Sequence, residues 1–120
     1  MLMKMNKTIA GYHILMILSA VDNKFTPGED RVIADYMERS TPFKINLDSE
    51  MEILSALSPD DYMVHFQKAM AHFYEDSTET ERNELITFAI KLAKSDKVIS
   101  REENIFIDEL FNEWTETKIS

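Results

Sequence analysis

The amino-acid sequence predicts an all-α protein, a compact bundle of about six helices. Only two glycines and three prolines interrupt its 120 residues. Between these interruptions the apolar residues recur at three- and four-residue spacing, which is the periodicity of amphipathic helices and not of strands. The hydrophobic share of 44% and the charged share of 29% are typical of a folded globular chain. We therefore expect one domain over residues 1–120, built around a single core.

Capping residues mark the positions at which the helices begin. A Ser or Thr followed three residues later by an acid allows each side chain to bond an amide of the first turn. Pro27 and Pro59 also stand where a helix tolerates a missing amide hydrogen. The four capping pairs are Thr26 with Glu29, Ser58 with Asp61, Thr78 with Glu81, and Ser100 with Glu103. The predicted helices cover residues 7–21, 27–39, 49–57, 59–75, 79–94 and 101–114, and residues 40–48 are predicted as an extended connector.

The apolar faces of these helices predict the core. The first helix is apolar on nearly all sides between Ile14 and Leu18, so it should be the most enclosed element. Each of the longer helices that follow carries one inward-facing stripe at helical spacing. The predicted inward residues are Ile33, Tyr36, Met37, Tyr62, Phe66, Ala69, Phe73, Leu85, Phe88, Ala89, Leu92, Ile107, Leu110, Phe111 and Trp114.

The charge balance restricts the possible partners. There are 22 acidic and 13 basic residues, a formal net charge of -9, which would repel nucleic acid and attract divalent cations or a basic protein surface. We therefore expect a protein partner and no nucleic acid. The absence of cysteine agrees with a cytoplasmic location. The apolar run from Ile14 to Leu18 is too short to span a membrane, and no cleavage site of a signal peptide follows it.

The chain contains an internal repeat at an offset of 96 − 22 = 74 residues. The segment DNKFTPGE over residues 22–29 parallels DKVISREE over residues 96–103, and the match extends into the flanking helices. It predicts two pseudo-symmetric helix-loop-helix units, about residues 7–39 and 79–114, with a connector and extra helices over residues 40–78. The aligned apolar pairs are Ile14 with Phe88, Leu18 with Leu92, Ile33 with Ile107, and Tyr36 with Leu110.

This repeated pattern of an apolar helix, an Asp, an apolar residue, a Ser or Thr cap and a Glu resembles that of the TerB-like tellurite-resistance domains. The resemblance spans both units and implies an all-helical, non-enzymatic protein with a role in bacterial responses to tellurite and other stresses. It also implies that acidic loop residues hold a metal ion. Carried over by position, these residues are Asp22 and Glu29 in the first unit and Asp96 and Glu103 in the second. Oxygen ligands of this kind suit Ca²⁺ or Mg²⁺.

Other chemistry finds little support in the sequence. Neither loop has the ligands or the glycine of an EF-hand, and no histidine follows a glutamate at the spacing of a di-iron bundle. His65 and His72 lie seven residues apart, too far for one metal ion, and are interpreted as partly exposed histidines paired with Asp61 and Asp76. We therefore expect a TerB-like stress-response binding module. The alternative is a helical interaction or scaffolding domain without metal, and a metal-dependent hydrolase is the least favoured class.

Overall fold

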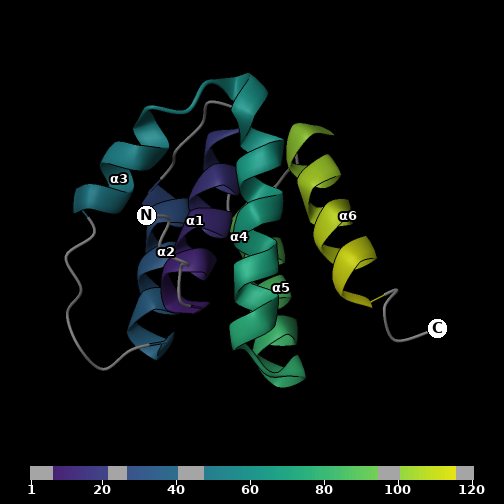
Figure 1. The fold of residues 1–120 in the computed structure, drawn as a ribbon. Coiled ribbons are helices and arrows are strands. Elements are labelled where there is room, and N and C mark those ends of the chain that lie inside the picture. The colour runs from purple at the N-terminus through teal and green to yellow at the C-terminus, as the bar shows by residue number, and fades with distance from the viewer. Residues whose placement is uncertain (1–6, 22–26, 41–47, 95–100, 116–120) are drawn as a thin grey trace.

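The computed structural model describes residues 7–21, 27–40, 48–94 and 101–115, and these form only helices and short turns (Figure 1). The predicted all-α class is therefore confirmed. The helix ends lie within two residues of the predicted ones, except that the first three residues of the predicted fourth helix form a 3₁₀ turn, η1. The elements are α1 (Lys7–Ala20), α2 (Pro27–Ser40), α3 (Asp48–Ser55), η1 (Pro59–Asp61), α4 (Tyr62–Asp76), α5 (Glu79–Ala93) and α6 (Arg101–Thr115).

Helix α1 lies at the centre of the bundle and packs against all five other α-helices. Nine of its residues, from Ala10 to Ser19 with the exception of Met16, are buried. Helix α4 crosses in front of it in Figure 1, with α3 on one side and α6 on the other. The prediction that the first helix is the most enclosed element follows from its apolar character on all sides, and the structure confirms it.

The two predicted repeat units contribute equivalent residues to one common core. All eight aligned apolar residues are buried, among them Leu18 and Leu92 with no exposed surface. Helix α1 packs on α2, and α5 packs on α6; across the units, α2 contacts α5 and α1 contacts α6. A twofold axis that exchanged the units would produce these two cross-contacts together. The axis itself and the duplication stay predictions.

One predicted core residue is exposed. Helical spacing predicts that Phe111 belongs to the inward stripe of α6, but 38% of its surface is open to solvent. The buried face of α6 is formed by Glu103, Ile107, Leu110 and Trp114. These positions recur every three or four residues, and Phe111 is rotated about 100° past Leu110. Spacing alone does not distinguish a residue of the buried stripe from an apolar residue directly beside it.

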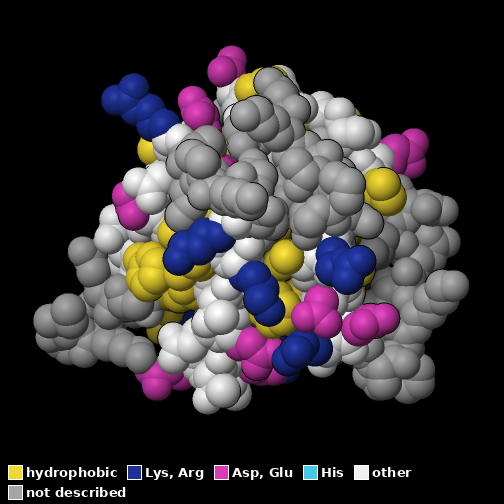
Figure 2. Space-filling model, turned by 180° about the vertical axis from the view of Figure 1, so that it is seen from behind, with side chains coloured by type: hydrophobic (Ala, Val, Ile, Leu, Met, Phe, Trp, Pro, Cys, Tyr) yellow, Lys and Arg dark blue, Asp and Glu magenta, His cyan; other side chains and the backbone are white. Residues whose placement is uncertain are grey.

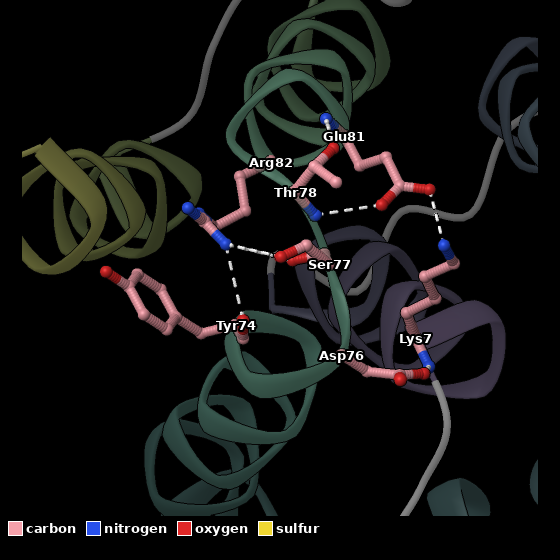
Figure 3. Close-up of polar contacts among 7 residues, drawn as sticks. All are labelled: Lys7, Tyr74, Asp76, Ser77, Thr78, Glu81 and Arg82. Carbon is pink, nitrogen blue, oxygen red and sulfur yellow. Dashed lines mark hydrogen bonds and ion pairs between the residues drawn. The ribbon is translucent and has the colours of Figure 1, made fainter.

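The turn between α4 and α5 is fixed by polar contacts from two sides (Figure 3). The Glu81 amide donates to the Thr78 hydroxyl over 3.2 Å, and the Thr78 amide donates to Glu81 Oε1 over 2.9 Å, which is the predicted reciprocal capping box. Lys7 joins the first helix to this turn, because its backbone amide donates to Asp76 Oδ2 over 3.0 Å and its ammonium group pairs with Glu81.

The predicted capping pair at the start of η1 is also in contact. The Ser58 amide donates to Asp61 Oδ2 over 3.3 Å.

Candidate functional sites

The four carboxylates predicted to hold a metal ion are only partly described by the structure. Asp22 and Asp96 lie outside the described residues, and only the helical backbone of Glu29 is described. Glu103 is fully buried on the inner face of α6. Among residues 7–21, 27–40, 48–94 and 101–115, no three His, Asp or Glu side chains are arranged to hold a metal ion. The four-residue site therefore stays a prediction that depends mainly on side chains outside these ranges.

Three polar side chains from three helices form a continuous hydrogen-bonded chain that runs from the buried His13 to two partly exposed residues. His13 of α1 has only 2% of its side chain exposed, and both of its ring nitrogens are engaged. Nδ1 lies 2.7 Å from Nε2 of His65 on α4, and Nε2 lies 2.7 Å from Oε1 of Glu50 on α3. The two imidazole rings lie edge to edge and nearly coplanar, with centroids 5.0 Å apart and planes inclined by 24°. The chain thus connects α3 to α4 through α1.

The surroundings of His65 disfavour its charged form. Burial is the main cause that lowers its pKa below the ordinary value of 6.5, and the neighbouring His13, Lys68 and His72 lower it further. The carboxylate of Glu50 opposes them and raises the pKa. The net effect is a lowered pKa, so His65 takes up a proton less readily than a solvated histidine.

Sequence reasoning missed this chain and gave one of its members the wrong partner. The predicted partial exposure of His65 agrees with the structure, but its side chain bonds His13 and not Asp61. The available signal was His13 itself, a polar residue directly before the apolar stretch of α1, because a buried polar side chain requires partners. The sequence could not name those partners, which lie 37 and 52 residues away.

A groove with an apolar floor and an acidic rim lies between α4 and α6. It has a volume of about 520 Å³. The buried side chains of Met70 and Trp114 form its floor, and the Trp114 ring stacks on Phe73 with centroids 5.3 Å apart. Three glutamates stand around it, and no Lys, Arg or His is among the described residues that line it. The described lining residues are Gln67, Met70, Ala71, Tyr74, Glu75, Glu109, Glu113 and Trp114.

Lining residues on both helices of this groove are fixed by polar and cation–π contacts. Gln67 Nε2 of α4 donates to Glu109 Oε2 of α6 over 2.9 Å. Arg82 lies over the Tyr74 ring, 4.1 Å from its centroid, and donates to the carbonyl of Ser77 over 2.8 Å (Figure 3). The cation near Tyr74 is therefore anchored to the α4–α5 turn. The groove can accept apolar side chains in its floor and cationic groups at its rim.

The opposite face of the molecule has a different character. Figure 2 shows Lys and Arg side chains there interspersed with Asp and Glu, with apolar surface between them. A hollow between α2 and α5 has both signs of charge in its lining, which is Arg31, Val32, Ala34, Asp35, Glu38, Lys91 and Lys94. The groove between α4 and α6 is thus distinguished by charge of one sign.

None of the described helices combines the length and the apolar character needed to cross a membrane. Comparison of the chain with protein-family models, curated proteins and solved structures gives no match in any of the three.

Proposed function

We propose that this chain is a cytoplasmic, non-enzymatic helical binding module of the TerB-like type, and that it binds a basic amphipathic helix of a protein partner in the α4–α6 groove. The observation that supports this proposal is the combination of an apolar floor, Met70 and Trp114, with Glu75, Glu109 and Glu113 at the rim. A basic amphipathic helix offers apolar side chains for the floor and Lys or Arg for the rim.

The geometry favours a helix over an extended peptide. An extended peptide gains affinity by pairing its backbone with a sheet edge, and the described residues contain no strand. Two neighbouring helices instead form a groove that an additional helix can enter with side chains at positions i, i+3 or i+4, and i+7. Glu109 and Glu113, four residues apart on α6, would then face successive turns of the partner.

The direct test uses a synthetic helical peptide of Leu and Lys, about 15 residues long, with its leucines on one face. Trp114 is the only tryptophan of the chain and lies in the floor, so its emission reports groove occupancy when the peptide lacks tryptophan. We expect saturable binding accompanied by a change in Trp114 emission. Binding should weaken as salt concentration rises, because rim charges are screened.

A pair of matched variants separates the groove from the general acidity of the chain. Glu109→Gln with Glu113→Gln removes two rim charges, and Glu52→Gln with Glu84→Gln removes two charges from exposed positions elsewhere. We expect the first pair to raise Kd by about fivefold to tenfold, since each exposed charge pair contributes up to about 1 kcal/mol. The control pair should raise it by less than about twofold at physiological salt. Equal losses from both pairs would show that the attraction is unspecific.

The divalent-cation hypothesis is a separate proposal that rests on the family resemblance. It requires Asp22 and Asp96 to meet near a pseudo-axis, with Glu29 or Glu103 completing the site. Thermal melts with and without millimolar Ca²⁺ or Mg²⁺ test it, with the Asp22→Asn, Asp96→Asn double variant as control, because a bound ion stabilises the folded state by mass action. A wild-type gain that the double variant lacks would support it; equal melting curves would leave the metal-free interaction module.

A further inference from the structure

The Glu50–His13–His65 chain has a limited capacity for protons. A neutral imidazole carries one N–H, and an imidazolium carries two. When the carboxylate of Glu50 is ionised and both rings are neutral, His13 donates from Nε2 to Glu50 and accepts at Nδ1 from Nε2 of His65. Each of the two 2.7 Å contacts then contains one hydrogen.

One additional proton can be accommodated without changing the geometry. It gives one imidazolium within the pair, and the single hydrogen between Nδ1 of His13 and Nε2 of His65 can belong to either ring. The resulting charge lies beside the Glu50 carboxylate, 2.7 Å from the other nitrogen of His13. A charge-assisted hydrogen bond of this kind is stronger than a neutral one.

A second additional proton cannot be accommodated. Both rings would then be imidazolium ions, and two N–H groups would face each other across the 2.7 Å gap between His13 and His65. No acceptor remains in that contact, and the two like charges repel. His13, with 2% of its side chain exposed, cannot leave the core, whereas His65 is partly exposed on α4.

We propose that the Glu50–His13–His65 chain is an acid-sensitive lock between α4 and the α1–α3 pair. The lock is closed while the two imidazoles carry at most one positive charge between them. It opens when both are protonated, and His65 then turns out to solvent while Glu50 keeps its ion pair with His13. The device is independent of the α4–α6 groove and concerns how the bundle responds to acid.

The groups around His65 set the pH range in which the lock opens. They are His13 from α1, Glu50 from α3, and Lys68 and His72 from α4 itself. Because the folded-state pKa of His65 is below 6.5, the unfolded chain binds more protons than the folded one as the pH falls below that value. The stability contributed by the closed lock is thus complete above about pH 6.5 and is lost as the pH falls through the lowered pKa.

The test compares urea midpoints between about pH 7 and pH 5.5 for the wild type and two variants. His65→Gln retains an N–H that can donate to His13 but cannot become charged. His72→Gln is the control on the same helix, because His72 has the smallest of these influences on the pKa of His65. We expect the unfolding constant of the wild type and of His72→Gln to rise by up to about tenfold per pH unit, the limit for one linked proton. His65→Gln should show a clearly smaller rise, and equal pH dependence in all three proteins would overturn the lock.

A second measurement on the wild type does not depend on how well the variants fold. Ring-proton NMR of the three histidines follows both the charge of each ring and the proximity of His13 to His65. We expect the cross-peak between these two rings to disappear as the second of them becomes protonated. A cross-peak that persists when both rings are protonated would contradict the proposal.

Discussion

The Tyr36 side chain of α2 lies directly against the backbone of Gly11 on α1. A Cβ atom at position 11 would come within 2.4 Å of the Tyr36 hydroxyl oxygen and within 2.9 Å of two ring carbons. Tyr36 is itself buried, and its ring packs edge-on against Phe88 of α5, with centroids 5.3 Å apart. Gly11 therefore allows α1 and α2 to approach closely at the point where α5 joins them.

Gly11→Ala is expected to destabilise the fold, against the usual direction for a helical glycine. Alanine would ordinarily stabilise a helix interior by about 0.5–1 kcal/mol. Here the added methyl group overpacks the contact with Tyr36, which costs about 1–3 kcal/mol. Chemical denaturation measures the difference, and Tyr36→Leu provides the control background, because the shorter side chain should make room for the methyl group. A stabilised Gly11→Ala protein would show that α1 and α2 are farther apart.

The capping box at the start of α5 predicts an unequal effect of two neighbouring threonines. Thr78→Ala removes the oxygen that accepts the Glu81 amide and should lower the free energy of unfolding by about 1 kcal/mol. Thr80→Ala changes an exposed threonine within the same helix and should have an effect within about 0.5 kcal/mol. Urea denaturation of both variants checks this expectation. Equal midpoints would mean that the Thr78 cap contributes nothing measurable.

The fold could be predicted from the sequence to a greater extent than the sites. Helix starts depend on local chemistry, and the Thr78 cap could be predicted because its partner is three residues away. His13 depends on His65 across 52 residues, and spacing along a chain does not encode which two helices cross. The groove depends on the same crossing, since Met70 and Trp114 share a floor only because α4 and α6 are neighbours. In both sites, the pairing of helices supplies the information that local pattern lacks.

The contact between Lys7 and Glu81 predicts a local pH effect in acid. The hydrogen bond from Lys7 is the largest cause that lowers the pKa of Glu81 below 4.5, followed by the hydrogen bond from the Thr78 amide. The stability that depends on ionised Glu81 is therefore present above about pH 4.5 and is lost as the pH falls through the lowered value. Lys7→Gln should raise the pKa of Glu81, measured by NMR titration. An unchanged pKa would indicate that the Thr78 amide alone holds the carboxylate ionised.

The repeat hypothesis predicts matched energetic roles for Leu18 and Leu92, the aligned leucines of α1 and α5. Both are fully buried in the common core. Truncation to alanine removes the same apolar atoms from each site, so Leu18→Ala and Leu92→Ala should each cost about 2–5 kcal/mol. If the two units have equivalent packing, the two costs should also agree within about 1 kcal/mol, because the residual cavity and not the leucine itself causes most of the variation between sites. Ile53→Ala on α3, where the side chain is 47% exposed, is the control and should change stability by less than about 0.5 kcal/mol. Urea denaturation of the three variants gives the comparison. If the costs for Leu18 and Leu92 differ by several kcal/mol, the two leucines have unequal packing environments. The aligned sequence pattern would then reflect common capping chemistry more than a duplicated unit.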